Sequence, residues 1–299
     1  MIPECMTSLK LKLKNYGNRV KETDKEGWCQ RMNTDKKVVL LLHGMGFRDN
    51  GIINYWGRIP KLIESRGYKV YYGNQDSNAP IEVNGQVIAN RLQSIFEETN
   101  CNEIHIIAHS KGGLDARYAI SSLGMDRYVS TLTTISTPHN GSPTVDRLLT
   151  LPDFCVRIAA LCTDLCLRIA GDRHPDAYHV FHSFTTKEAS QFNASNPDSP
   201  TVCYRSYAFV MRSPFSDIFL WLPNLIVGHY EGENDGLLSP EDVKWGEFKG
   251  VIRSRSLRGI SHCDEVDMRR RRFTKKQGEH IGDILELYSS ILDEYEERK

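Results

Sequence analysis

The sequence has no excess of positive or negative charge, because its 299 residues include 38 Lys and Arg and 38 Asp and Glu. A balanced charge excludes the overall basic surface that nucleic-acid-binding domains carry. The run 269–272 consists of consecutive arginines, but no recognition motif accompanies it. Such a short run near one end of a chain is typical of a solvated face, so we expect no nucleic-acid partner.

Long apolar runs are also missing. No stretch approaches the roughly 18 apolar residues that a membrane-spanning helix requires, so we expect no transmembrane segment. The first residues show no basic-then-apolar signal pattern, since Lys10, Lys12 and Lys14 interrupt the one candidate run. These absences predict a cytoplasmic protein, with a secreted mature form as the alternative.

The eight cysteines include no Cys-x-x-Cys pair. A chain of this length buries a core that does not depend on disulfides, so we expect mostly reduced thiols. Cys155, Cys162 and Cys166 follow one another at intervals of seven and four residues, as on one side of a helix. We interpret these three as small buried hydrophobic residues and not as a metal site.

Short apolar runs alternate with helical patterns over the first half of the chain. The expected strands are 37–42, 70–72, 104–108 and 131–135, and the expected helices are 55–66, 82–99 and 113–122. This alternation predicts a mostly parallel, doubly wound sheet with helices on both faces. Further strands are expected at 203–210 and 225–230, before a last helix whose apolar stripe runs from Ile281 to Leu292.

Between about 144 and 200 the alternation stops, because this stretch has helical patterns but no clear strand. It is unusually apolar for an insertion, with Leu148, Phe154, Ile158 and Leu161 among its residues. We therefore predict one α/β domain over 36–299 with a helical insertion at about 144–200. Residues 1–35 form an N-terminal extension for which the sequence predicts no particular structure.

The segment 108–112, Ala-His-Ser-Lys-Gly, stands between a predicted strand and a predicted helix. In a nucleophile elbow a serine occupies the tight turn from strand to helix, and the residues two before and two after it must be small. Ala108 and Gly112 meet this need, although Gly is usual at the first of these positions. The alternative is a plain Ser-Gly turn, but the strand and helix around it favour Ser110 as a nucleophile.

A serine hydroxyl needs a general base, and the base needs an acid that orients it. In the nucleophile-elbow architecture the chain order is Ser, then Asp or Glu, then His. Asp235 follows a predicted strand within a turn, and His262 precedes the last helix. His229 comes too early, within a predicted strand, and His280 begins a predicted helix, so we favour Asp235 and His262.

A second element of such a site is the loop after the first central strand. Gly44 in this loop lets the backbone approach a substrate, so the Met45 amide is a candidate oxyanion donor. The Lys111 amide, at the start of the helix after Ser110, is the other. The alternative is an ordinary glycine-rich loop in which His43 has a structural hydrogen-bonding role.

Together these segments resemble the true bacterial lipases of the Pseudomonas, Burkholderia and clostridial type, which have the α/β-hydrolase fold. The resemblance runs from about residue 37 to the end of the chain. It implies hydrolysis of carboxylic esters, including acylglycerols, through an acyl-enzyme intermediate and with no cofactor required for catalysis. The segments that carry the resemblance are His43-Gly44-Met45-Gly46-Phe47, 108–118, Thr137-Pro138-His139-Asn140-Gly141-Ser142, 234–239 and 262–266.

The resemblance also implies a lid and a structural metal. In such lipases an apolar helical lid opens at lipid surfaces, which suits 144–180, whereas the alternative is an ordinary cap. Some relatives hold calcium with an acid two residues after the histidine, which is Asp264 here, and Asp217 is an approximate match for the second acid. We do not expect zinc at the cluster of His174, Asp176, His179 and His182.

The sequence leaves the substrate open. The leading prediction is a triacylglycerol lipase or broad esterase that acts on a lipid or ester, with a lipid–water interface as a further partner. A hydrolase of polyester, thioester or amide substrates could use the same three residues. A non-catalytic binding protein with this fold is a third alternative, against which the intact set of Ser110, Asp235 and His262 argues.

Overall fold

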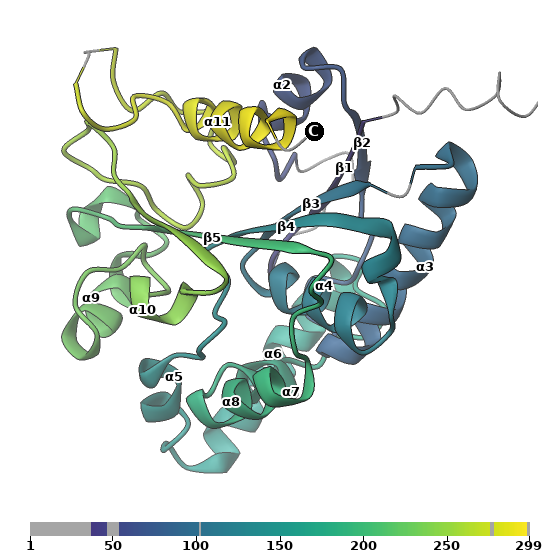
Figure 1. The fold of residues 1–299 in the computed structure, drawn as a ribbon. Coiled ribbons are helices and arrows are strands. Elements are labelled where there is room, and N and C mark those ends of the chain that lie inside the picture. Colours follow the sequence, from purple (N-terminus) through teal and green to yellow (C-terminus); the bar gives the residue numbers. More distant parts are fainter. Residues whose placement is uncertain (1–36, 47–53, 102, 276–277, 298–299) are drawn as a thin grey trace, which may run out of the picture. The chain divides into compact units, whose positions relative to one another are not determined.

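A six-stranded parallel sheet forms the centre of the protein (Figure 1). The structure is a computed structural model, and it describes residues 37–46, 54–101, 103–275 and 278–297. The strands lie in the order β2-β1-β3-β4-β5-β6, and every neighbouring pair is parallel. Their bounds are β1 Val38–Leu42, β2 Lys69–Tyr72, β3 Ile104–His109, β4 Val129–Ile135, β5 Cys203–Phe209 and β6 Glu247–Ile252.

Helices cover both faces of the sheet, as the predicted α/β architecture requires. Side chains of β1 alternate between the faces: Val39 and Leu41 pack with helices α2 (Ile59–Ser65) and α11 (Ile284–Glu296). Val38, Leu40 and Leu42 pack with α3 (Ile81–Thr99) and α4 (Lys111–Ser121). All five are at most 1% exposed, and burial of each such side chain stabilises the fold by about 1.5–3 kcal/mol.

Four helices lie between β4 and β5, in the segment for which we predicted a helical insertion. They are α5 (Pro143–Leu148), α6 (Asp153–Ile169), α7 (Ala177–Ser183) and α8 (Thr186–Ser195). The prediction of buried cysteines is wrong, because Cys155, Cys162 and Cys166 on α6 are exposed. Among the residues of α6, only Ala160 is buried, so most of this helix faces away from the protein.

The predicted strand at 225–230 is wrong, because these residues form the second half of helix α9 (Trp221–Tyr230). Short apolar runs with β-branched residues do not distinguish a strand from a helix by pattern alone. Here the apolar run begins earlier, at Trp221, and Pro223 occupies the first turn, where a helix tolerates it. The edge strand β6 pairs with β5, and its partly exposed residues had given no strand signal.

Three shorter elements complete the described part of the chain. They are η1 (Met125–Tyr128), η2 (Pro214–Ser216) and α10 (Pro240–Val243). In the described residues, no helix is both long and apolar enough to cross a membrane. The predicted extension 1–35 lies outside the described residues.

Candidate active site

Ser110 sits between β3 and α4 with backbone φ of 52° and ψ of −132°. An L-residue with positive φ is strained, and such strain is characteristic of the turn that presents a nucleophile. The turn is held by hydrogen bonds from the Ser110 amide to the Ile135 carbonyl (2.9 Å) and from the Thr137 hydroxyl to the Ser110 carbonyl (2.7 Å). The local geometry is therefore that of the predicted elbow.

Glycines allow the loop after β1 to approach this turn. A Cβ atom on Gly44 would lie 2.7 Å from Cβ of Ser110, and one on Gly112 would lie 2.5 Å from the carbonyl oxygen of His43. Larger residues at these two positions would force the two segments apart. The Met45 backbone is thereby placed beside the elbow, and Lys111 is the first residue of α4, where an amide has no acceptor within its own helix.

Asp235 and His262 are brought together from segments on either side of β6. The Nδ1 atom of His262 lies 2.8 Å from Oδ2 of Asp235, and the His262 amide donates to the Asp235 carbonyl at 2.9 Å. The amides of Leu237 and Leu238 donate to the other carboxylate oxygen at 2.8 and 2.9 Å. His229, which we excluded, is exposed on α9 and not in a strand.

Asp235 remains ionised although it is buried. Burial alone would raise the pKa of its carboxyl group, but the electrostatic interaction with His262 and the hydrogen bonds with His262, Glu265 and Leu238 outweigh this effect. The pKa of Asp235 is therefore held at about 2. A buried carboxylate of this kind can orient an imidazole and stabilise an imidazolium.

A cavity of about 220 Å³ joins the predicted residues: Met45, Ser110 and His262 all line it. Its other walls are mostly apolar and come from α5, α7, the start of α9 and the loop after it. These side chains are Val145, Phe181, Phe184, Leu220, Leu237 and Leu238. The site therefore combines a strained serine, a histidine held by a buried carboxylate and room for an apolar group.

Residues 38–198, just over half of the chain, match the protein family described as palmitoyl protein thioesterase. The chain belongs to this family. It is 29% identical over 258 residues to triacylglycerol lipase 2 of Saccharomyces cerevisiae, a match that covers 81% of this chain and 73% of the yeast protein. It is 32% identical over 175 residues to a triacylglycerol lipase of Pseudarthrobacter phenanthrenivorans, covering 54% of either chain. The chain thus spans about half the length of this bacterial relative.

Solved structures show the same fold. A metagenomic carboxyl esterase superposes with a TM-score of 0.68 over 89% of this chain and 77% of its own, at 17% identity. At this identity the likeness shows the fold alone, which is that of the α/β-hydrolases. The predicted fold class and the resemblance to lipases are thus confirmed, and the chain is a carboxylic-ester hydrolase of this superfamily.

This hydrolase contains a second hydrogen-bonded chain that the sequence did not reveal. The Gly44 amide donates to the hydroxyl of Tyr55 at 2.9 Å, and this hydroxyl lies 2.6 Å from Nδ1 of His109. On its other side, Nε2 of His109 lies 3.3 Å from Oε2 of Glu265. Because the Tyr55 oxygen accepts from the Gly44 amide, the Tyr55 hydroxyl can donate its own proton to Nδ1 of His109. The proton of the His109 ring is then on Nε2, from which it can be donated to Glu265.

Glu265 lies next to both members of the Asp235–His262 pair. Its Oε2 atom is 3.9 Å from Nδ1 of His262. Burial and the charge of Asp235 raise the pKa of Glu265 well above its ordinary value, which favours the protonated form of this carboxyl group. In the sequence, Glu265 is distinguished only by its position three residues after His262, and this position alone predicts no role.

Within the described part of the hydrolase, one group of three residues could supply ligands to a metal ion. Ligand atoms of His109, His262 and Glu265 lie within 4.8 Å of one another. Burial and the charge of His262 lower the pKa of His109 well below its ordinary value, so its ring is neutral. Since Tyr55 already uses one ring nitrogen of His109, we assign this group to the hydrogen-bonded chain.

The predicted calcium ligands, Asp217 and Asp264, both lie beside Arg269. Arg269 binds both carboxylate oxygens of Asp217, one of them at 2.7 Å, and its Nη1 atom lies 3.6 Å from Oδ1 of Asp264. Burial opposes the ionisation of Asp217, but bonds from Arg269, Ser261 and Phe219 keep its pKa below the ordinary value. Because Arg269 already binds both Asp217 oxygens, the pair of carboxylates does not fit calcium while Arg269 is in place.

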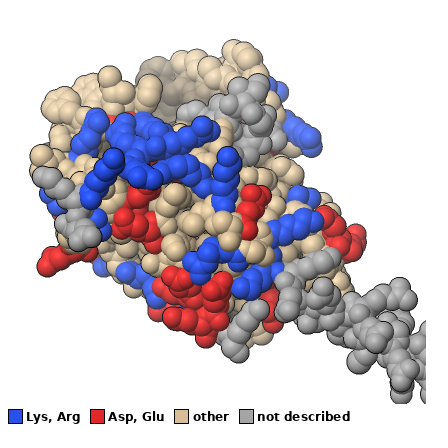
Figure 2. Space-filling view, turned by 90° about the horizontal axis from the view of Figure 1, so that it is seen from above, with Lys and Arg blue, Asp and Glu red and all other residues tan. Residues whose placement is uncertain are grey.

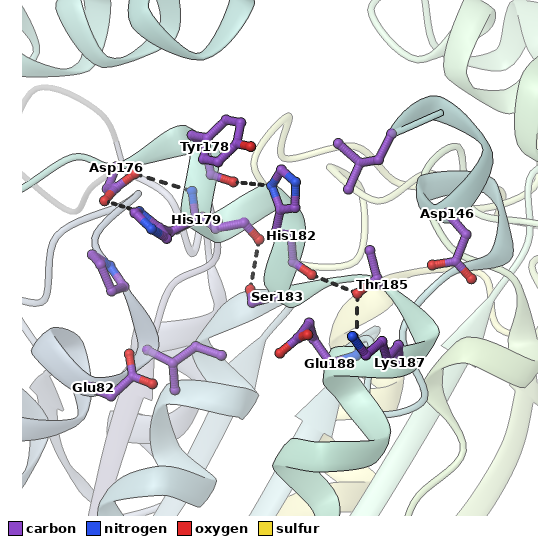
Figure 3. A pocket seen from close by; sticks show the side chains of 14 residues that line it. Glu82, Asp146, Asp176, Tyr178, His179, His182, Ser183, Thr185, Lys187 and Glu188 are labelled. Carbon is purple, nitrogen blue, oxygen red and sulfur yellow. Dashed lines mark hydrogen bonds and ion pairs between the residues drawn. The ribbon is translucent and has the colours of Figure 1, made fainter. Parts of the chain in front are cut away.

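The cluster for which we considered zinc lies at another cavity, of about 900 Å³, beside α7 (Figure 3). Oδ2 of Asp176 accepts from Nδ1 of His179 at 2.5 Å, and Nδ1 of His182 bonds the Tyr178 carbonyl at 2.7 Å. His174 does not line this cavity. Within the described residues, these side chains do not bring three ligand atoms to one point.

Proposed function

We propose that Ser110, His262 and Asp235 form a catalytic triad that hydrolyses acyl esters through a covalent intermediate. Ser110 Oγ attacks the ester carbonyl carbon while His262 takes the hydroxyl proton. His262 then passes this proton to the departing alcohol, as the bond between acyl carbon and alcohol oxygen breaks. Water, deprotonated by His262, releases the acid and restores Ser110. Asp235 stabilises the imidazolium in both steps, which its low pKa supports.

The Met45 and Lys111 amides are the proposed oxyanion donors. Two backbone N–H groups aimed at the carbonyl oxygen stabilise the negative charge that develops there, and loss of one such donor typically costs about 3 kcal/mol. The close approach of Gly44 to Ser110 supports this role, because it brings the loop within reach of the reacting carbonyl. The start of α4 contributes the second amide.

The observation that carries the substrate class is the apolar wall of the cavity beside Ser110. An acyl chain buries its methylene groups against such a wall, which stabilises the complex by about 0.8 kcal/mol per group. The names of the yeast and bacterial relatives, both triacylglycerol lipases, agree with this substrate class. We therefore propose a lipid ester as the substrate.

Helix α6 is the proposed lid for a lipid–water interface. Its outward residues repeat at helical intervals and are each between 59% and 82% exposed: Phe154, Ile158, Leu161, Leu165 and Ile169. An apolar stripe of this size is unfavourable in water and is typical of a surface that contacts lipid. The neighbouring helices α5 and α7 supply walls of the active-site cavity, so movement of this layer would change access to Ser110.

A fluorophosphonate probe tests the triad, because it reacts only with an activated serine. We expect labelling of the native chain and no labelling of Ser110→Ala. Ser136→Ala is a matched control at another buried serine with positive φ, and it should still be labelled. A native chain that takes no label would refute the catalytic proposal and support a binding protein.

Rates on p-nitrophenyl esters of increasing chain length, with a triolein emulsion in parallel, test the substrate class. We expect kcat/KM to rise with chain length and the emulsion to be hydrolysed. The name of the matched family makes a thioester the second candidate, so palmitoyl-CoA belongs in the same assay. Activity restricted to short soluble esters would contradict the lipid substrate and the lid.

A further inference from the structure

Helix α9 exposes several large apolar side chains, although its Val227 is buried. Trp221, Leu222 and Leu225 are 43–49% exposed, whereas the polar residue Asn224 is 8% exposed. The Asn224 side chain is fixed in the interior by hydrogen bonds with Asn234, one of them at 2.6 Å. A surface helix normally buries its apolar stripe, but here no described residue covers much of this face. In Figure 1, α9 lies at the periphery of the molecule, away from the sheet.

The turn before α9 presents still more exposed side chains. Phe215, Ile218 and Phe219 are 81%, 78% and 79% exposed. Their backbone is nevertheless held firmly, because the side chain of Asp217 is buried, accepts from the Phe219 amide at 3.0 Å and is bound by Arg269. Three large apolar side chains are therefore held in water by an ordered backbone, and the exposure of this much apolar surface to water is unfavourable.

Arginines surround these apolar residues. A hollow of about 520 Å³ is lined both by apolar residues, Phe215, Ile218 and Trp221, and by arginines, Arg258, Arg269 and Arg271. Its single carboxylate, that of Asp217, is already bound to Arg269. Figure 2 shows a group of Lys and Arg side chains on one face of the molecule, with groups of Asp and Glu on the same face.

Two of these three arginines have no acidic partner in the described part of the chain. Within the described residues, no carboxylate lies within 4.0 Å of the guanidinium groups of Arg258 and Arg271. Arg212 is likewise unpaired among those residues, and its amide donates to the Arg258 carbonyl at 3.0 Å. An apolar tip with unpaired arginines beside it matches the chemistry of a lipid surface with anionic headgroups, where the apolar residues enter the lipid and the arginines contact phosphates.

We propose that η2, α9 and the neighbouring arginines form a docking surface for an anionic lipid bilayer. The surface is continuous with the active site, because Leu220 lines the cavity beside Ser110 and the next residue, Trp221, lines the arginine hollow. Docking here would therefore hold the mouth of the active site against the membrane. The proposal rests on the proposed function, since a bilayer is a source of acyl esters for such an enzyme.

Vesicle sedimentation tests this surface independently of catalysis, because Ser110→Ala protein can be used throughout. We expect this protein to bind vesicles of phosphatidylcholine that contain phosphatidylglycerol and to bind pure phosphatidylcholine weakly. The pair Arg258→Gln and Arg271→Gln should lower binding by about fivefold for each arginine. The pair Phe215→Ser and Phe219→Ser should lower it by about tenfold for each side chain.

Matched controls lie elsewhere on the surface. Arg127→Gln with Lys61→Gln removes equal charge from exposed residues, and Val83→Ser with Val87→Ser removes exposed apolar residues from α3. Both pairs should keep full binding. Equal binding to the two kinds of vesicle would overturn the proposal. Binding that depends on the arginines but not on the phenylalanines would also overturn it, in favour of a soluble polyanion.

Hydrolysis of a soluble short-chain ester separates the two proposals. In an otherwise native chain with Ser110 intact, the docking variants should keep this activity while losing activity on anionic vesicles. If the native chain hydrolyses soluble esters but does not bind vesicles, the docking surface is wrong and the proposed function stands. If it binds vesicles as expected but hydrolyses no ester, the proposed function is wrong and the docking surface stands.

Discussion

The Tyr55 hydroxyl lies 2.6 Å from Nδ1 of His109, the residue directly before the candidate nucleophile. The same hydroxyl accepts from the Gly44 amide, so it connects the loop with the proposed oxyanion donor to the elbow. On the far side of His109, Glu265 connects the chain of hydrogen bonds to the loop of His262. Three loops from distant parts of the sequence are therefore fixed relative to one another through one buried imidazole.

Tyr55→Phe should lower kcat while the protein keeps its fold. The substitution leaves the Gly44 amide and Nδ1 of His109 without their partner, which costs about 1–3 kcal/mol, and it frees the loop that carries Met45. We expect kcat on a soluble ester to fall about tenfold or more, with KM changed less. Tyr68→Phe is the matched control, a buried tyrosine in the same core cluster. Equal effects of the two substitutions would contradict a positioning role for Tyr55.

Asp235→Asn should leave a residual activity that depends on Glu265. The charge of Asp235 helps to keep Glu265 protonated, so its removal lowers the pKa of Glu265. The ionised Glu265, close to Nδ1 of His262, could then partly orient the imidazole. We expect kcat to fall by about 10³–10⁴ and the remainder to increase as pH rises.

The matched variant for this prediction is Asp235→Asn with Glu265→Gln, in which no carboxylate remains beside His262. Its residual rate should be about tenfold lower still and independent of Glu265 titration. Glu265→Gln alone should keep most of the native rate, because the native group is already protonated. Identical pH–rate profiles for the single Asp235 variant and the double variant would refute a substitute role for Glu265.

Asp242 makes stability depend on pH in a direction opposite to that of most carboxylates. Burial, the charge of Glu231 and a hydrogen bond with Glu231 raise the pKa of Asp242 to about 8, whereas the unfolded value is about 3.9. The folded state thus binds the extra proton between these values. The contribution of Asp242 to stability is complete below about pH 4 and is lost as pH rises to about 8.

Asp242→Asn removes this dependence and keeps an acceptor for the Ser239 amide. Relative to the native chain, its melting temperature should increase from pH 5 to pH 8, by roughly 2–4 °C for each kcal/mol recovered. Scanning calorimetry at several pH values measures the difference. Glu241→Gln, at the exposed neighbour in the same helix, should show a constant difference. A difference for Asp242→Asn that does not change with pH would contradict the raised pKa.

Most of the sheet could be predicted because its central strands are buried on both faces. The run Val38–Leu42 is apolar throughout, and such a run in a chain where strands alternate with helices indicates a strand buried on both faces. The strand β6 could not be predicted, since Lys249 and Gly250 interrupt an edge strand that is only partly buried. Helix α9 was mistaken for a strand because the short apolar run 225–230 does not by its pattern alone distinguish the two.

The candidate site, too, could be predicted from the sequence only in part. The order of Ser110, Asp235 and His262 follows from chain connectivity, so the sequence could predict which residues would meet. The partners Tyr55, His109 and Glu265 meet only through the packing of three separate loops, and each alone looks like an ordinary polar or aromatic residue. The calcium prediction had a similar limit, because no local pattern places the side chain of Arg269 against Asp217.

Arg269 gives the final prediction, since its guanidinium binds Asp217 and lies beside Asp264, the two residues predicted as calcium ligands. The native chain should therefore melt at the same temperature with calcium and with chelator. Arg269→Gln should be less stable, because it leaves Asp217 buried without its charged partner, which costs about 3–5 kcal/mol. Added calcium should then restore part of the lost stability, because two carboxylates become available to it. Arg271→Gln serves as the control for loss of a nearby positive charge. If chelator lowers the melting temperature of the native chain, calcium binds despite Arg269 and the prediction is wrong.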